Sequence, residues 1–291
     1  MDKPMVGIIG GTGLGDVLAA RIRNPVFKEL DTPFGSPSGP VLVGTFGHNQ
    51  IAFLPRHGKG HRFHPSVVPY AANIFALKSL GVTALIASGA VGSLRQEIAP
   101  GHLVLPDQFI DKTFRRQNTF FDSIGAVHVE FDQPCCRRLR EKIMLAAAHI
   151  GSVTHADGTY VCMEGPQFST RAESLMHRAW GGDLIGMTAL PEAKLAREAQ
   201  MCYALVALVS DYDCWRPHQP DQDKPGLLAE IIANLNRAAD NAAALIEKTL
   251  EVNSGLCDQS CPCRKSLQSA VWTNPDAVNP AARKLLNPLF E

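Results

Sequence analysis

Two aspartates, Asp211 and Asp213, stand at the end of the apolar run 204–210. A run of this kind is typical of a buried strand, and residues i and i+2 of an extended chain point to the same side. Both carboxylates are therefore predicted to face one pocket at the carboxyl end of a sheet, where open α/β folds bind ligands. Paired acids can hold an acceptor nitrogen and an amino group of one heterocycle. They can also share a proton, which makes one of them a general acid.

Three other segments, each at the end of a predicted strand, carry groups suited to an anion. Residues 10–13 read Gly-Gly-Thr-Gly, and their glycines let backbone amides and the Thr12 hydroxyl approach an anion closely. Arg56 offers a planar fork that matches phosphate oxygens. The backbone at Gly89 and Ala90 adds a further amide donor. Each glycine segment alone is equally typical of a tight turn or a close helix–strand contact.

The segment that begins at Arg56 is also rich in histidine. Three histidines fall within eight residues: His57, His61 and His64. A metal site is the competing interpretation, but interleaved basic side chains at Arg56, Lys59 and Arg62 would repel a cation. We therefore expect an anion site or a solvated basic loop here, and we predict no metal ligands in the site.

Two more segments supply apolar and hydroxyl groups. In residues 162–170 a Gly-Pro turn precedes Phe168, Ser169 and a threonine. Phe168 can stack on a base, and the alternative is a core aromatic. Residues 183–189 are predicted to form a strand that ends in small and hydroxyl side chains, among them Thr188. For the aspartate pair itself, a Mg²⁺ site or a solvated strand end is the alternative.

The overall composition favours an enzyme without a nucleic-acid or membrane partner. The chain has 291 residues, 45% of them hydrophobic, which is enough for one large α/β domain or two small ones. Lys+Arg and Asp+Glu are equal at 28 each, so no net charge points to nucleic acid or an anionic membrane. The apolar runs are strand-sized, and the first residues lack the apolar core of a signal peptide. We expect a cytoplasmic protein.

The pattern alternates strand, helix and glycine-rich connection, which predicts an α/β fold. A Thr170–Glu173 capping box is predicted to open a helix, Ser66 to cap another, and residues 111–132 to form a flap. In the helix predicted over 226–250, the face that begins with Leu228 and Ile232 is apolar. Further strands are predicted over 6–9, 41–46, 50–54, 84–87 and 103–110, and further helices over 66–80, 133–150 and 191–200.

We predict a domain over 1–253 and a cysteine-containing extension over 254–291, where the composition shifts to Cys, Ser, Asn and Pro. The extension carries Cys257, Cys261 and Cys263. Three cysteines without a nearby histidine are an incomplete zinc set, so a local disulfide, free thiols and a metal site all stay open. The other five are interpreted as small core hydrophobes: Cys135, Cys136, Cys162, Cys202 and Cys214.

Taken together, these segments resemble the 5′-methylthioadenosine phosphorylases among the trimeric purine nucleoside phosphorylases. The resemblance spans about residues 5–250, in family order. Its motifs are Gly10–Gly13, Thr32–Gly35, Arg56–Gly58, Tyr70–Asn73, Gly92–Arg95, Asp107–Asp111, Glu164–Pro166, Met187-Thr188, Pro191-Glu192 and Asp211–Trp215. The resemblance implies a single domain with a central mixed, partly closed sheet flanked by helices, assembled as a homotrimer. It also implies phosphorolysis of methylthioadenosine to adenine and 5-methylthioribose 1-phosphate, with inorganic phosphate as co-substrate and no cofactor.

The resemblance also implies roles for single residues. Asp211 would donate a proton or hydrogen bond to N7 of the departing base, and Asp213 would accept from the 6-amino group. Phe168 would stack on the base and Ser169 would help to set base preference. The remaining roles would be phosphate binding by Thr12, Arg56, His57, the Gly89-Ala90 backbone and Thr188, ribose contact by the Met187 backbone, and contact of His128 with a neighbouring subunit's substrate.

Departures from the family pattern define the alternatives. Residues 216–224 are polar where many members are apolar, so a broader adenosine phosphorylase is one alternative. Gly186 and Gly89 replace the Asn and Thr of some members. A 6-oxopurine (methylthioinosine or inosine) phosphorylase is a second alternative, but such enzymes usually have Asn at the place of Asp211. A Mg²⁺-dependent transferase and a non-catalytic nucleoside-binding or redox-sensing protein are the other classes.

Overall fold

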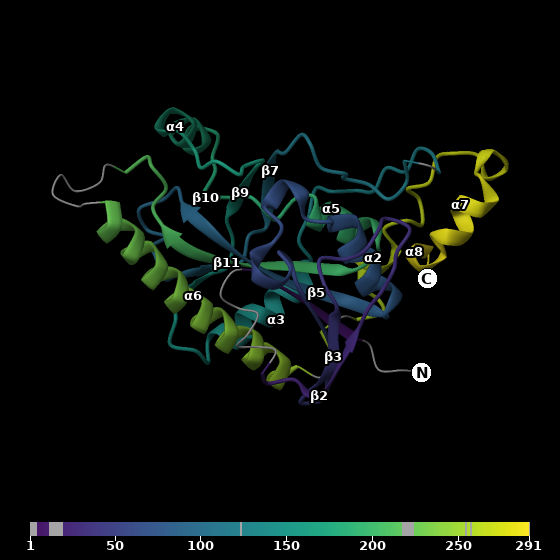
Figure 1. Ribbon diagram of the computed structural model, residues 1–291, viewed down its shortest axis with the longest axis horizontal. Helices are drawn as coiled ribbons and strands as arrows, with labels where there is room; N and C mark the ends of the chain where they lie inside the picture. The colour runs from purple at the N-terminus through teal and green to yellow at the C-terminus, as the bar shows by residue number, and fades with distance from the viewer. Residues whose placement is uncertain are drawn as a thin grey trace.

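The described residues of the computed structural model form one mixed sheet with helices on both faces (Figure 1). The structure describes residues 5–11, 20–122, 124–216, 224–253, 255–256 and 258–290. The strand order is β2-β3-β4-β1-β5-β10-β9-β7, while β11 pairs with β5 and β6, and β6 with β8. The strands are β1 Met5–Gly10, β2 Arg23–Lys28, β3 Val41–Phe46, β4 Asn49–Pro55, β5 Val82–Ser93, β6 Leu103–Val104, β7 Gln108–Lys112, β8 Thr154–His155, β9 Thr159–Met163, β10 Leu184–Gly186 and β11 Cys202–Asp211.

Parallel pairing brings the ends of four strands to one edge. β1 runs parallel to β4 and β5, and β5 runs parallel to β11. Their carboxyl ends therefore meet on the same side of the sheet, as the sequence predicts. β10 pairs with β9 in parallel and with the last residues of β5 in antiparallel fashion, which makes the sheet mixed.

The strands have two cores because their side chains alternate between the faces. In β11, Tyr203 and Leu205 belong to one core, with α2 and α5, while Ala204 and Val206 belong to the other, with α3 and α6. The helices are α2 Tyr70–Ser79, α3 Arg137–Ala147, α4 Arg171–Ala179, α5 Glu192–Glu198, α6 Lys224–Val252, α7 Pro280–Leu285 and α8 Asn287–Phe290, with 3-10 turns η1 Lys59–His61, η2 Pro65–Val67, η3 Pro262–Lys265 and η4 Pro275–Ala277.

Several local predictions are confirmed. The capping box is present, since Thr170 accepts from the Glu173 amide and Glu173 accepts from the Thr170 amide. The strands predicted over 41–46 and 50–54 are present as β3 and β4, which pair in antiparallel fashion. Gly81 follows the end of α2 with φ +86°, a conformation that favours glycine.

Other local predictions are wrong. The single strand predicted over 103–110 is two short strands, because β6 pairs with β11 and β8 whereas β7 pairs with β9. Ser66 caps no helix: α2 begins at Tyr70, and the Ser66 hydroxyl donates to the Glu164 carbonyl instead. α3 and α5 are shorter than predicted, and Pro191 precedes α5 rather than lying within it.

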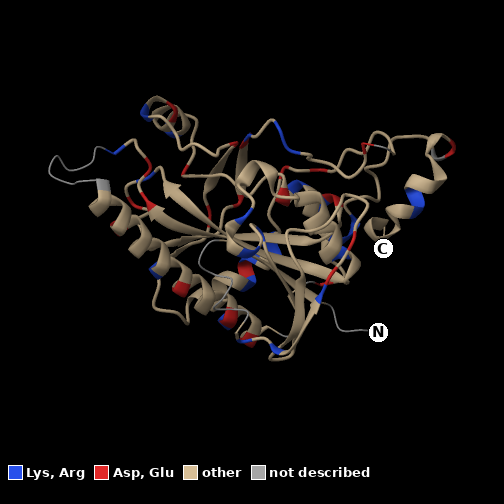
Figure 2. Cartoon of the chain, in the orientation of Figure 1, with Lys and Arg blue, Asp and Glu red and all other residues tan. Residues whose placement is uncertain are grey.

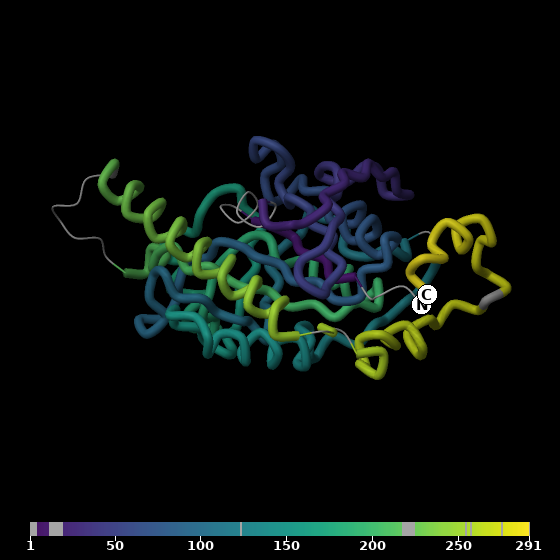
Figure 3. Tube along the Cα trace, turned by 90° about the horizontal axis from the view of Figure 1, so that it is seen from below, coloured from purple at the N-terminus to yellow at the C-terminus, as the bar shows by residue number. Residues whose placement is uncertain are grey.

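The long helix α6 is confirmed, but its predicted apolar face is buried only in its second half. In this face Ala239, Ala242, Leu245 and Ile246 are buried, whereas Leu228 is 59% exposed and Ile232 is 48% exposed. The start of α6 extends beyond the sheet in both views, where the described residues leave Leu228 and Ile232 exposed (Figures 1 and 3).

Residues beyond 253 pack on both cores. Leu256, Cys261 and Cys263 join the core of α3 and α6, while five residues further along join the core of α2 and α5: Leu267, Ala270, Val278, Leu286 and Leu289. The segment lies at one end of the molecule (yellow in Figures 1 and 3). Whether 254–291 is a separate extension stays a prediction.

Charge and apolar length set simple bounds on the surface. Basic and acidic segments are interspersed over the chain (Figure 2), in keeping with the equal totals of 28. Among the described residues, none of the helices combines the length and the apolar composition that crossing a bilayer requires.

Candidate active site

Asp211 and Asp213 both lie against the end of β5, at the carboxyl end of β11. A Cβ placed on Gly92 would lie 3.2 Å from Asp211 Oδ1 and 3.2 Å from the Cβ of Asp213. Glycine at this position therefore lets both acids approach the strand. Asp213 Oδ2 is buried and has no hydrogen-bond partner among the described residues. A buried carboxylate oxygen without a partner is costly, which points to a ligand donor that completes it.

The route by which the two acids meet differs from the prediction. β11 ends at Asp211, with a register shift after Val209, and Asp213 lies in a turn rather than in the strand. The alternation of an extended chain is thus not the cause of the pairing. The Ser210 hydroxyl lies 2.6 Å from Asp211 Oδ2 and orients that carboxylate, a contact that the sequence analysis missed.

Arg56 is completely buried beneath the predicted anion site. Its Nε and Nη2 donate to the Glu192 carboxylate at 2.7 and 2.8 Å, and its Nη1 donates to the Ser88 carbonyl at 2.6 Å. The pairing with Glu192 keeps the pKa of Arg56 above its usual value despite the opposing effect of burial. Two of the five guanidinium N–H donors have no described acceptor in these contacts, which leaves them for an anion.

The glycine segments lie directly against this arginine. The Gly11 amide donates to Ser88 Oγ at 3.0 Å, and a Cβ on Gly11 would lie 3.2 Å from Arg56 Nη1. A Cβ on Gly89 would lie 3.1 Å from Thr188 Oγ1. The structure therefore brings Arg56, Gly89 and Thr188 together, with Ala90 next in β5. Thr12 lies outside the described residues.

His57 stands beside Arg56 as a neutral ring. Its Nδ1 lies 2.8 Å from the Phe63 carbonyl, which can only accept, so Nδ1 carries the proton and Nε2 is an acceptor. Burial, together with the charge of Arg56, lowers the pKa of His57 from its usual 6.5 to about 4. At neutral pH this side chain can accept a hydrogen bond from a protonated phosphate oxygen.

Tyr160 explains a glycine that departs from the family pattern. A Cβ on Gly186 would lie 2.1 Å from the Tyr160 hydroxyl, so any side chain there would collide with the ring. The same hydroxyl accepts from the Thr188 amide at 3.3 Å. Tyr160 thus fills the space beside Gly186 and fixes Thr188. No local signal in the sequence pairs residues 26 positions apart in this way.

The flap is anchored to the site by a buried arginine that the sequence analysis did not single out. Arg116 donates to the Met187 carbonyl at 2.5 Å, to the Leu190 carbonyl at 2.6 Å and to the Glu164 carbonyl at 2.7 Å. The Glu164 carboxylate accepts from the Phe114 amide at 2.8 Å. Met187 is held by its backbone from one side, and its sulfur packs against Gly165.

Phe168 is open rather than a core aromatic. Its side chain is 86% exposed. The next residue, Ser169, accepts from Cys214 Sγ at 3.2 Å through its carbonyl, which places this loop beside the Asp213 turn. An exposed aromatic next to the acid pair is available to stack on a bound base.

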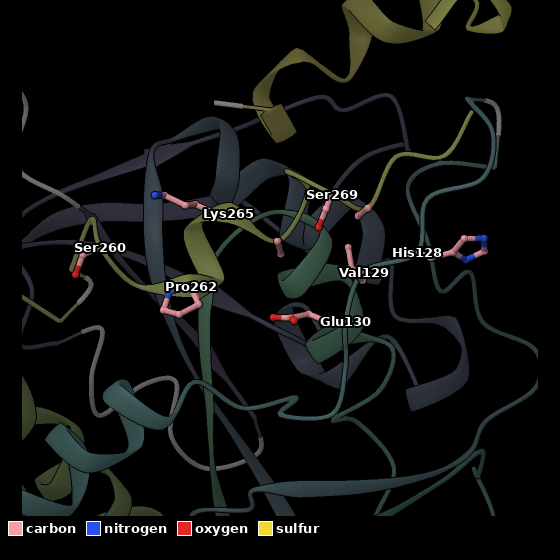
Figure 4. Close-up of a pocket in the computed structure, with 9 residues that line it drawn as sticks. His128, Val129, Glu130, Ser260, Pro262, Lys265 and Ser269 are labelled. Atoms are coloured by element: carbon pink, nitrogen blue, oxygen red, sulfur yellow. The ribbon is translucent and has the colours of Figure 1, made fainter. Parts of the chain in front are cut away.

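His128 lies apart from the acid pair and packs against the C-terminal segment of the same chain. Its amide donates to the Ala270 carbonyl at 2.9 Å, and its ring packs edge-on against Trp272. A cleft opens here between residues 128–130 and 260–270, and in Figure 4 the His128 ring points away from the other labelled residues. Asp211 and Asp213 do not line this cleft. The predicted contact of His128 with a neighbouring subunit's substrate stays a prediction.

The site thus combines two features at one edge of the sheet. An acid pair can bind and protonate a nitrogen heterocycle, and a buried arginine with nearby amides and a hydroxyl can hold an anion. Such a site, on a mixed sheet, suits an enzyme that transfers a glycosyl group between a base and an anion.

Comparison with known proteins identifies the family. Residues 5–251 match the family described as the phosphorylase superfamily. The S-methyl-5′-thioadenosine phosphorylase of Cereibacter sphaeroides is 46% identical over 280 residues, 96% of this chain and 94% of that protein. The protein of the same name from Geobacter sulfurreducens is 44% identical over 287 residues, 97% of this chain and 96% of that protein. The chain therefore belongs to the S-methyl-5′-thioadenosine phosphorylases of the phosphorylase superfamily.

Solved structures agree with this family and confirm the predicted fold. A methylthioadenosine phosphorylase from an antarctic soil metagenomic library has a TM-score of 0.89 and 40% identity, with 99% of both chains covered. The methylthioadenosine phosphorylase of Schistosoma mansoni, solved with adenine, has a TM-score of 0.84 and 34% identity, covering 93% of this chain and 99% of that one.

Proposed function

We propose that this chain cleaves 5′-methylthioadenosine with inorganic phosphate, giving adenine and 5-methylthioribose 1-phosphate. The observation that carries the proposal is the acid pair at Gly92, with the buried and unpartnered Asp213 Oδ2, at the same sheet edge as Arg56 and Thr188 among the described residues. The family supports the same reaction.

The acid pair deals with the departing base. Adenine leaves poorly as an anion, so a proton or hydrogen bond at N7 lowers the barrier. Asp211 supplies it, oriented by the Ser210 hydroxyl. Asp213 accepts from the 6-amino group through Oδ2, which favours adenine over a 6-oxopurine because a carboxylate cannot donate to the exocyclic O6. Phe168 stacks on the base, and Ser169 lies beside it.

The other subsite holds phosphate against the ribose. Arg56, fixed by Glu192, and the backbone at Gly89 and Ala90 address its oxygens, with the hydroxyls of Thr188 and Thr12. The neutral His57 accepts from a protonated phosphate oxygen. A phosphate held there attacks C1′ and also stabilises the positive charge that develops on the ribose as the base departs.

In this proposal the flap contributes to two sites: Arg116 supports the site of its own subunit, and His128 reaches the site of an adjacent subunit. Arg116 fixes the Met187 carbonyl, which leaves the amide side of Met187 for the ribose hydroxyls. We propose a homotrimer in which His128 reaches the 5′ end of the substrate of an adjacent subunit. The position of His128 far along the flap, on the C-terminal segment, supports a role outside its own site.

Release of free base from the purified protein tests the proposal. Methylthioadenosine, adenosine and methylthioinosine are compared with and without inorganic phosphate, in the presence of EDTA. We expect phosphate-dependent adenine release that is fastest from methylthioadenosine. Equal release without phosphate would overturn phosphorolysis, loss of activity in EDTA would favour a metal-dependent transferase, and faster cleavage of methylthioinosine would overturn the role of Asp213.

A further inference from the structure

Four cysteine sulfurs gather at the end of the sheet opposite the candidate active site. The Sγ atoms of Cys136, Cys202, Cys261 and Cys263 all lie within 4.8 Å of one another. Cys136 Sγ and Cys261 Sγ are 3.7 Å apart. A disulfide requires about 2.05 Å, whereas two sulfurs on a tetrahedral zinc ion with bonds of about 2.3 Å are about 3.8 Å apart.

The four sulfurs come from three distant parts of the chain. Cys136 directly precedes α3, Cys202 is the first residue of β11, and Cys261 and Cys263 flank Pro262 at the start of η3. All four side chains are buried, with 1–5% of their surface exposed. A set of four ligands that is closed to solvent matches a structural metal site, because a catalytic site keeps one position open.

The surroundings supply positive charge and donors to the sulfurs. Arg197 Nη1 lies 3.5 Å from Cys263 Sγ, and Arg197 is itself fixed because its other terminal nitrogen donates to the Gln133 carbonyl. Cys136 directly precedes α3 and so lies at the N-terminus of that helix. Four thiolates on a divalent ion carry a net charge of about −2, which a buried guanidinium and a helix N-terminus partly offset.

We propose that Cys136, Cys202, Cys261 and Cys263 bind a zinc ion that fastens the C-terminal segment to α3 and β11. One Zn²⁺ replaces four thiol protons, which pass to solvent, and no electron is transferred. The ion joins three parts of the chain that are far apart in the sequence, and only the fold brings them together, so the free energy of metal binding adds to the stability of the folded state. The sequence analysis left Cys257, Cys261 and Cys263 as an incomplete zinc set, and Cys257 lies outside the described residues. The two further ligands are Cys136 and Cys202, which the sequence analysis interpreted as core hydrophobes.

The metal content of the purified full-length protein tests the site. The protein is prepared in reducing buffer without chelator and measured by elemental mass spectrometry. We expect about one zinc per chain in the wild type and about tenfold less in Cys263→Ser. The matched control is Cys135→Ser, because Cys135 is equally buried and adjacent to Cys136 but lies outside the cluster. The control should retain its zinc.

Two measurements on the wild type keep the test valid if Cys263→Ser does not fold. Growth with cobalt should give the absorption bands of a tetrahedral thiolate site. Removal of the metal under denaturing chelation should expose four additional thiols to alkylation and lower the melting temperature after refolding. A wild-type protein that lacks metal would overturn the proposal, whether its four cysteines are reduced or, by a mass smaller by two hydrogens per pair, joined in disulfides.

Discussion

The two ends of β11 carry polar clusters of opposite character. At the amino end, the sulfur of Cys202 is buried with three other cysteine sulfurs, and all four lie within 4.8 Å of one another. At the carboxyl end, Asp211 and Asp213 are half-buried, and Asp213 Oδ2 has no described partner. The strand has 10 residues, so about 30 Å separates the clusters.

The two ends of β11 therefore have different roles: the amino end contributes to stability, and the carboxyl end contributes to binding and chemistry. The closed end satisfies its own groups and contributes to holding the C-terminal segment in place. The open end leaves acids, amides and an exposed aromatic for a ligand, and this arrangement costs stability in the ligand-free protein. Substitutions at the open end should therefore alter turnover with little change in melting, unless they disturb its packing.

The largest effect should come from Gly186, a tightly packed position near the open end. Gly186→Ala would place a methyl group 2.1 Å from the Tyr160 hydroxyl. We expect a loss of about 3 kcal/mol in the free energy of unfolding, measured in urea, because the core must shift to admit it. Gly151→Ala is the control, since no atom lies within 4 Å of a Cβ there among the described residues. Equal stability of both variants would contradict the packing of Tyr160 against Gly186.

Asp211→Asn tests the chemistry of the open end. The amide has the same shape as the acid but cannot protonate N7 as a carboxyl group does. We expect phosphate-dependent adenine release to fall by about 10²-fold or more, with the melting temperature unchanged. A near-wild-type rate with an unchanged order of substrates would exclude Asp211 as the general acid.

Glu198 lies away from both ends, beneath the flap, and is sensitive to pH. Burial raises the pKa of this carboxyl group from 4.5 to about 7, although it accepts from the Phe120 amide at 2.8 Å. Because the folded-state pKa is raised, ionisation of Glu198 costs stability as the pH rises from about 4.5 through about 7. Glu198→Gln should therefore stabilise the protein by roughly 2 kcal/mol at about pH 8 and hardly at all at about pH 4.5. An equal gain at both values would rule out ionisation of Glu198 as the cause.

Phe168→Ala should have the smallest effect, and only on binding. The side chain is 86% exposed, so its removal should leave the melting temperature unchanged. Loss of stacking on the base should raise KM for methylthioadenosine by roughly tenfold. A matched control is Phe27→Ala, which removes another exposed aromatic, at 71%, on the edge strand β2. An equal effect of both variants on KM would argue against base stacking.

Much of the fold was predictable because its signals are local. The apolar run before Asp211, the hairpin of β3 and β4, and the Thr170 capping box each depend on residues close in the sequence. The family motifs extended these predictions to the sheet and to the reaction. Local patterns also gave a wrong prediction. Residues 103–110 are apolar enough for one strand, but they form two strands because β6 pairs with β11 and β7 pairs with β9.

The contacts that complete the site and the cysteine cluster were not predictable from local patterns. Arg56 and Glu192 are 136 positions apart, and their pairing depends on how α5 lies over the sheet. Cys136 and Cys202 looked like core residues because nothing near them in the sequence is a ligand. Only the fold brings Cys261 and Cys263 to them. Long-range packing, rather than residue type, decides both cases.

The sugar product of the reaction tests the central claim most directly. Methylthioadenosine is incubated with the protein and with phosphate labelled with ¹⁸O at all four oxygens. The mass of the sugar product is then measured by mass spectrometry. If phosphate held near Arg56 attacks C1′, the product is 5-methylthioribose 1-phosphate that retains every labelled oxygen. Free, unlabelled 5-methylthioribose would show that water is the nucleophile and would contradict the account.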